Sequence, residues 1–134
     1  MKKIILPIFV ALMATVLFTS CEKDMTDDEL RTELQNQVFT GSNDSGSFTL
    51  NLASATFELD EPDTVEEDGT VWENISTGTW IVTNGELILS IVAVDGDVFL
   101  ATAKLAIEKS GKRLQLPTWN GAAYNGPTVQ LDRK

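Results

Sequence analysis

Few residues in this 134-residue chain have side chains suited to nucleophilic or redox chemistry. Cys21 is the only cysteine, and histidine is absent. Disulfide bonds, cysteine or histidine nucleophiles, and the usual zinc, copper and haem sites therefore lack their residues. Carboxylates remain, and they could bind a hard cation or act as an acid–base pair. Because 20 Asp and Glu residues make such pairs common by chance, we predict no catalytic residues, no cofactor and no enzymatic activity.

The densest group of carboxylates lies in residues 60–69, which we interpret as a loop between two strands. Its acids are Asp60, Glu61, Asp63, Glu66, Glu67 and Asp68. A calcium loop needs ligands at alternating positions with a glycine turn, and Thr64 and Val65 interrupt that alternation. A solvated hairpin loop without metal is therefore the prediction, and calcium binding is the alternative. Asp63-Thr64-Val65 also resembles the Asp-Thr-aliphatic acceptor for O-glycosylation in Bacteroidota.

A basic and then apolar segment opens the chain. Lys2 and Lys3 precede an apolar run over residues 4–18, and Thr19-Ser20 separates this run from Cys21. The run is shorter than the roughly 20 residues that a transmembrane helix needs. A basic start, an apolar middle and small residues at the end are typical of a secretory signal peptide.

The stretch Leu17–Cys21 resembles the lipobox of bacterial lipoproteins, in the form found in Bacteroidota. The resemblance implies that residues 1–20 are removed, that Cys21 carries acyl chains such as palmitate, and that residues 21–25 tether a domain to a membrane. We therefore expect a lipoprotein of the bacterial cell envelope, anchored in the outer membrane and facing the periplasm or the cell surface. A plain signal peptide with an incidental cysteine is the alternative. The acidic residues 22–29 resemble the export signal of surface lipoproteins, or else form a solvated linker.

The mature chain would be strongly acidic. Without Lys2 and Lys3 it holds 8 Lys and Arg against 20 Asp and Glu, a formal net charge of −12. This charge repels nucleic acid and anionic lipid headgroups, so we exclude nucleic acid as a partner. Cationic or neutral partners fit it better. The remaining 114 residues suffice for one ordinary domain.

The first structural element of that domain is a helix. Thr26–Glu29 forms a capping box, which predicts that a helix begins there. Leu30, Leu34 and Val38 follow at helical spacing and form one narrow apolar stripe. We therefore predict a helix over about residues 27–38.

Alternating polar and apolar residues predict strands in the rest of the chain. The predicted strands cover about residues 47–52, 57–59, 70–76, 79–83, 86–94, 97–108, 113–116 and 128–131. Asn84-Gly85 and Asp95-Gly96 are strong hairpin signals, and residues 109–112 make a third turn. The prediction is one mainly β domain over residues 26–134, with one N-terminal α-helix. Its antiparallel meander closes into a lipocalin-like barrel, because closure hides the strand edges.

Three short motifs resemble the small lipocalin-like lipoproteins of Bacteroidota. They are Asp68-Gly69-Thr70-Val71, Gly78-Thr79-Trp80 and Asn84-Gly85-Glu86-Leu87, within a resemblance that covers roughly Phe57 to Leu116. The resemblance implies a barrel that binds a small apolar or amphipathic ligand. No ligand residue of that family maps onto a numbered position in this chain.

Two groups of residues are candidates for binding such a ligand. In the strand over residues 97–108, Phe99, Ala101 and Ala103 share the inward face. The two alanines leave space for a ligand, or Trp80 or another large ring fills it. Trp119 and Tyr124 lie in a Gly-rich segment, where their rings could stack on a ligand or a partner, or else plug the barrel. The predicted ligand-binding residues are therefore Trp80, Phe99, Ala101, Ala103, Trp119 and Tyr124.

The strand over residues 86–94 is apolar on both faces, so something must cover its outer side. The stripe of Leu30, Leu34 and Val38 is the expected cover, and a partner protein is the alternative. This leaves two hypotheses for function. The first is a non-catalytic lipoprotein that binds a small molecule in its barrel. The second is an interaction or inhibitor lipoprotein that contacts an envelope protein through an acidic or apolar surface.

Overall fold

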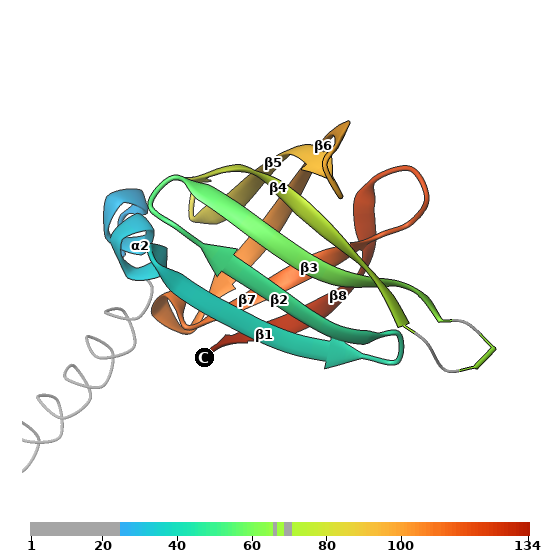
Figure 1. Cartoon of the computed structure of the whole chain (residues 1–134). Helices are drawn as coiled ribbons and strands as arrows, with labels where there is room; N and C mark the ends of the chain where they lie inside the picture. Colours follow the sequence, from blue (N-terminus) through green and yellow to red (C-terminus); the bar gives the residue numbers. More distant parts are fainter. Residues whose placement is uncertain (1–24, 66, 69–70) are drawn as a thin grey trace, which may run out of the picture.

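The computed structural model describes residues 25–65, 67–68 and 71–134 (Figure 1). Within these residues, one helix, α2 (Asp27–Leu34), precedes eight antiparallel strands that form a closed barrel in sequence order. The strands are β1 (Gln37–Asn43), β2 (Gly46–Leu52), β3 (Thr56–Val65), β4 (Val71–Thr83), β5 (Glu86–Val94), β6 (Asp97–Glu108), β7 (Arg113–Trp119) and β8 (Tyr124–Arg133). The predicted fold class, a meander closed into a barrel behind one N-terminal helix, is confirmed.

The barrel closes where the first strand meets the last. Phe39 and Thr40 of β1 pair with Arg133 and Asp132 of β8, and the Lys134 amide donates to the Val38 carbonyl at 2.8 Å. Closure pairs the first strand with the last, and fewer exposed strand edges are the physical advantage that favoured a barrel over an open meander.

The helix is shorter than predicted, and its last predicted turn belongs to a strand. The capping box at Thr26 and Glu29 forms as expected, but α2 ends at Leu34. Asn36 then has a φ of 61°, which breaks the helix and turns the chain into β1. Val38 is therefore a strand residue, and assigning it to the helical stripe was wrong. The neighbouring Phe39 explains the outcome, since β1 buries its ring fully in the barrel.

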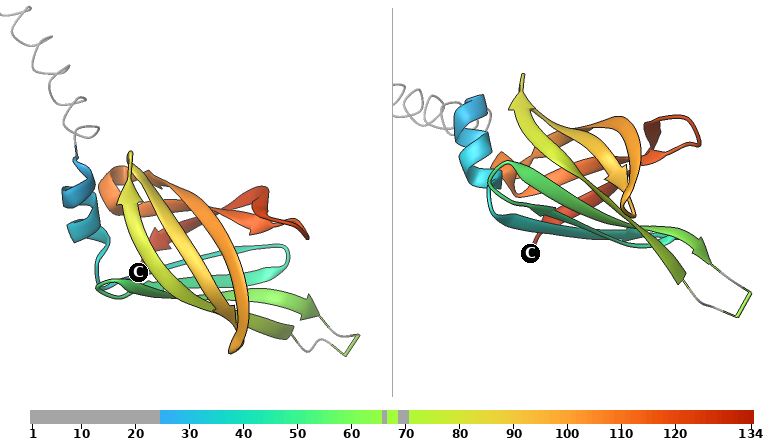
Figure 2. Two further views of the ribbon diagram at one scale, coloured as in Figure 1. Left: turned by 90° about the horizontal axis from the view of Figure 1, so that it is seen from above. Right: turned by 45° about the horizontal axis from the view of Figure 1, so that its top comes forward.

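The helix closes one end of the barrel rather than covering its outer wall (Figures 1 and 2). It packs against β4 and the 3₁₀ turn η1 (Lys109–Gly111), and Leu34 is fully buried in the barrel core. The Asp27 carboxylate accepts hydrogen bonds from the Asn84 and Gly85 amides at 3.0 and 2.9 Å, at the β4–β5 turn. The expectation that the helix covers the outer face of β5 was wrong. We call the end that carries α2 the closed end, and the opposite end the open end.

Strand boundaries differ from the prediction mainly around the acidic segment. Strand β3 continues to Val65, so the first part of the expected loop is strand. The two strands predicted over residues 70–83 are one strand, β4, with a register shift between Thr77 and Gly78. Strands β7 and β8 are also longer than predicted. Strand β7 continues to Trp119 and β8 begins at Tyr124, both at the open end.

The closed half of the barrel is filled by side chains. Trp80, Leu89 and Ala103 occupy one cross-strand row, and all three are buried in the core. The Trp80 indole donates to the Ala53 carbonyl at 3.1 Å, and the Arg31 guanidinium lies 5.2 Å from the ring centroid. The large Trp80 ring therefore fills the space left by the small side chain of Ala103. This is the alternative in which a ring, and not a ligand, occupies that space. In the part of the chain that the structure describes, no helix has the length and hydropathy needed to cross a membrane.

Candidate functional site

A cavity of about 430 Å³ occupies the open end of the barrel, remote from α2. Residues from all eight strands and from the β1–β2 turn line it. They are Asn43, Ser45, Phe48, Glu61, Pro62, Asn74, Val94, Phe99, Thr118, Trp119 and Tyr124. The volume falls within the range of small-molecule pockets in proteins.

One wall of the cavity is aromatic. Trp119 and Tyr124 are paired residues at the β7–β8 hairpin, and their ring centroids are 5.1 Å apart in an edge-to-face arrangement. Phe99 of β6 also contacts Trp119 edge to face, with a centroid distance of 5.4 Å. Tyr124 is buried, whereas Phe99 and Trp119 remain 37% and 39% exposed at the rim. The wall therefore offers a ligand a deep ring and two accessible rings.

The floor of the cavity is polar. The Tyr124 hydroxyl donates a hydrogen bond to Glu61 at 2.8 Å, and both residues are more than 90% buried. Burial raises the pKa of the Tyr124 hydroxyl well above its ordinary value, the negative charge of Glu61 raises it further, and Ser76 opposes the shift. Tyr124 is therefore a proton donor at physiological pH, and Glu61 is its acceptor.

The alternation of β3 and β4 explains why the floor is polar. From the closed end to the open end, the inward positions of β3 are Phe57, Leu59 and Glu61, and those of β4 are Trp80, Gly78, Ser76 and Asn74. Both strands therefore change from apolar to polar inward residues toward the open end, where Ser76 pairs with Leu59 and Asn74 pairs with Glu61. The change divides the interior into a packed core and a cavity with hydrogen-bonding groups.

The loop between β7 and β8 holds the rim in place. The Asn120 side-chain oxygen accepts hydrogen bonds from the Ala122 and Ala123 amides at 2.8 Å, and its side-chain amide donates to Asn125. The Thr118 hydroxyl donates to the Pro127 carbonyl at 2.7 Å across the hairpin. These bonds fix the backbone on both sides of Trp119, which favours a preformed wall over one that must order on binding.

Three of the six residues predicted to bind a ligand lie in the cavity wall: Phe99, Trp119 and Tyr124. Trp80 and Ala103 lie in the packed core instead. Ala101 packs partly buried against that core and is not a wall residue. Cys21, the predicted lipidation site, lies outside the described residues.

Sequence reasoning missed the polar floor. Glu61 was grouped with the acidic loop, although it follows Phe57 and Leu59 in strict alternation, and that spacing could have revealed an inward carboxylate. Phe48 alternates in the same way with Leu50 and Leu52, whereas Asn74 carried no comparable signal.

The other acids of this region do not converge on a metal site. Among the described residues, no group of three or more Asp, Glu, His or Cys side chains could hold a metal ion. Asp60 instead faces Glu73 across β3 and β4, and a hydrogen bond with Asp60, aided by charge repulsion, raises the pKa of Glu73. The threonine of the proposed glycosylation motif lies in β3, and Glu66 lies outside the described residues.

Comparisons with protein-family models, with curated proteins and with solved structures gave no match. The chemistry of the cavity itself therefore carries the functional argument. Its apolar rim, buried carboxylate and buried phenol can hold an amphipathic molecule, with the polar part of that molecule at the floor.

Proposed function

We propose that this protein is a non-catalytic, lipid-anchored lipoprotein of the bacterial envelope that binds a small amphipathic molecule in the open end of its barrel. The cavity is the observation that carries the binding part of this proposal. It joins accessible aromatic rings at the rim to a hydrogen-bonded polar pair at the floor. The resemblance of the motifs around Trp80 to lipocalin-like lipoproteins supports the same function.

Native mass spectrometry of the purified protein tests the binding part. We expect an additional mass from a co-purified small molecule, and we expect Trp119→Ala to reduce its occupancy because this ring lines the cavity. Trp72→Ala is the matched control, since Trp72 is an exposed tryptophan that is not a wall residue. A single unliganded mass in all three proteins would contradict the proposal.

The anchoring part rests on the Leu17–Cys21 stretch and has its own test. Radiolabelled palmitate should be incorporated into the wild-type protein and not into Cys21→Ser. The variant should also leave the membrane fraction, because a protein without acyl chains loses its apolar anchor. Identical fractionation of the two proteins would show that Cys21 is not the anchor.

An interaction function is the second candidate, because several large apolar side chains are exposed on the outer face of β4–β6. Val98 and Leu100 are 85% and 77% exposed, and Ile75, Ile81 and Val92 are also exposed. A patch of this kind is typical of a protein contact. Val98→Ser with Leu100→Ser should weaken capture of an envelope partner and leave the cavity intact. Unchanged capture would exclude this surface.

A further inference from the structure

The charge of the cavity restricts the kind of molecule that fits the proposed binding function. Glu61 is the only charged residue among the described residues of the wall, and it lies at the buried floor. A carboxylate at this depth disfavours an anionic ligand through desolvation and repulsion. It favours a ligand that brings a positive charge or a hydrogen-bond donor.

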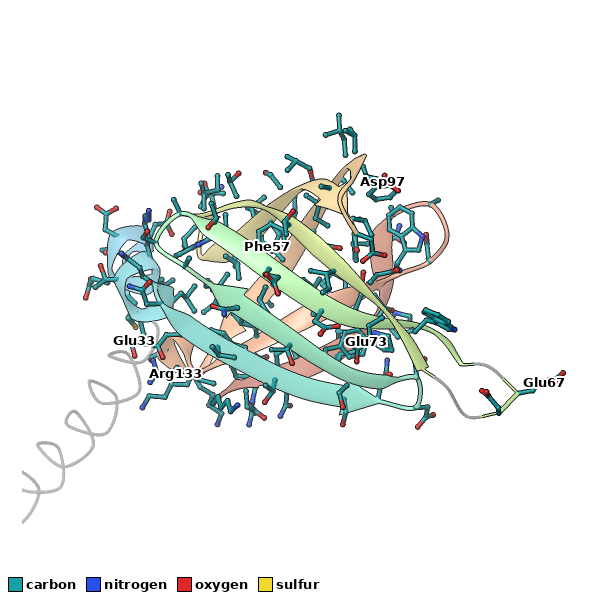
Figure 3. The ribbon with its side chains drawn as sticks, viewed as in Figure 1. Glu33, Phe57, Glu67, Glu73, Asp97 and Arg133 are labelled. Carbon is teal, nitrogen blue, oxygen red and sulfur yellow. The ribbon has the colours of Figure 1, made fainter. Side chains whose placement is uncertain are left out.

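The distribution of charge along the barrel reinforces this restriction. The sequence contains no Lys or Arg between Arg31 and Lys104. The basic residues of the described chain lie in α2, the second half of β6, η1, the start of β7 and the end of the chain: Arg31, Lys104, Lys109, Lys112, Arg113, Arg133 and Lys134. Acids at the open end are Asp44, Glu61, Glu67, Asp68, Glu73, Asp95 and Asp97. Figure 3 shows Glu67, Glu73 and Asp97 far from Arg133, which lies beside α2.

This separation of charge has a physical consequence for a ligand in solution. A mouth that carries one sign of charge attracts ions of the opposite sign and raises their local concentration. Basic residues at the closed end form ion pairs there, for example Arg133 with Glu33 at 2.7 Å, so they do not neutralise the mouth. The long-range field and the buried carboxylate therefore select the same sign of ligand charge.

The aromatic wall narrows the class of cation. Phe99, Trp119 and Tyr124 present ring faces or edges to the cavity, and aromatic faces attract organic cations. A bare metal ion does not fit, because the described part of the chain has no cluster of ligands for one. On the basis of the proposed binding function, we infer that the ligand is an organic cation. It carries an amine or quaternary ammonium group at the floor beside Glu61 and an apolar body against the rings.

Two matched series of probes test this inference. Tryptamine, tryptophol and indoleacetate share an indole body, and octylamine, octanol and octanoate share an alkyl chain. Isothermal titration calorimetry at neutral pH measures the affinity of each. We expect each amine to bind about tenfold more tightly than the alcohol with the same body, because only the amine makes a charge-assisted hydrogen bond. Each carboxylate should bind more weakly than the alcohol.

Two variants test whether Glu61, at the floor of the cavity, causes the preference for amines. Glu61→Gln should remove the advantage of the amines over the alcohols, because the neutral amide keeps an acceptor for Tyr124 but makes no charge-assisted hydrogen bond to an amine. Glu67→Gln changes the net charge equally at the same end but outside the wall, so it should retain most of the preference.

Four outcomes would overturn the inference. Tight binding of the carboxylates, or a preference for amines that survives in Glu61→Gln, contradicts the role of the floor. If the alcohols bind as tightly as the amines, and Trp119→Ala weakens their binding, the inference that the ligand is a cation is wrong. The proposed binding function would still hold. The absence of binding by all six probes would count against both.

Discussion

At the scale of single residues, the buried pair of Tyr124 and Glu61 is the most unusual feature of the molecule. A phenol and a carboxylate share a hydrogen bond inside the barrel. Buried polar groups are costly unless they are paired, and this hydrogen bond gives both the phenol and the carboxylate a partner. The pair is therefore a fixed point against which a ligand can be oriented.

Tyr124 can be titrated without interference, because it is the only tyrosine in the chain. Its pKa is raised in the folded state, so its contribution to stability is complete below about pH 10 and is lost as the pH rises further. We expect the ultraviolet absorbance of tyrosinate to appear at higher pH than in the unfolded protein. Glu61→Gln should shift the transition to lower pH, because it removes the negative charge beside the hydroxyl. Identical titration of the folded and unfolded proteins would contradict this assignment.

Glu73 offers a second test at a single residue. Its hydrogen bond with Asp60 and the repulsion between them raise its pKa, so folding is most favoured where Glu73 is protonated, and stability falls as the pH rises through the raised value. Glu73→Gln should therefore raise the melting temperature at neutral pH and have little effect in acid. Glu58→Gln, an exposed change of equal charge on β3, is the control. An equal gain from both variants would indicate net charge alone.

At the scale of elements, α2 acts as a plug for the closed end. It is only eight residues long, and isolated helices of this length are unstable in water. Its capping box, the bonds from Asp27 to the β4–β5 turn and the burial of Leu34 hold it in place. The tertiary contacts therefore stabilise the helix, and the helix in turn seals the core.

Leu34→Ala tests this role, because the side chain is fully buried in the barrel core. We expect the free energy of unfolding to fall by about 2–5 kcal/mol, through lost apolar burial and the cavity that remains. Chemical denaturation followed by tryptophan fluorescence measures the change. Thr32→Ala, on the exposed side of the same helix, should cost much less. Equal effects of the two substitutions would mean that α2 does not seal the core.

The elements differed in how well the sequence predicted them. Strands β5 and β6 were predicted with their observed bounds, because Gly-containing turns define both ends of each strand locally. The helix was predicted too long because Val38 continues a helical spacing by coincidence, and only pairing with β2 and β8 makes it a strand. Glu61 was misplaced because a dense run of acids resembles a loop. The end of the helix was thus decided by contacts distant in the sequence, whereas the alternation that includes Glu61 was obscured by the neighbouring acids.

At the scale of the whole molecule, closure of the barrel depends on the narrow seam between β1 and β8. Gly41 lies beside this seam, and an added Cβ atom would collide with the carbonyl oxygen of Gln130. A collision with backbone cannot be relieved by moving a flexible side chain. The glycine is therefore required by the distance between the strands rather than by its own backbone conformation.

Gly41→Ala should consequently destabilise the fold by an amount at or above the upper end of the roughly 1–3 kcal/mol typical of overpacking. Ser42→Ala, an exposed change at the next position of β1, is the control and should have little effect. Thermal unfolding followed by circular dichroism measures both. Wild-type stability of Gly41→Ala would show that the seam can widen without cost.

The position of α2 also determines how a guest molecule could reach the interior. Helix α2 is the first element that the structure describes, and the four residues between Cys21 and Thr26 can span at most about 13 Å. A lipid anchor at Cys21 would therefore hold the closed end of the barrel close to the bilayer, with the open end facing the aqueous compartment. A ligand would then enter the cavity from solution or from a neighbouring protein, and not by lateral diffusion from the bilayer.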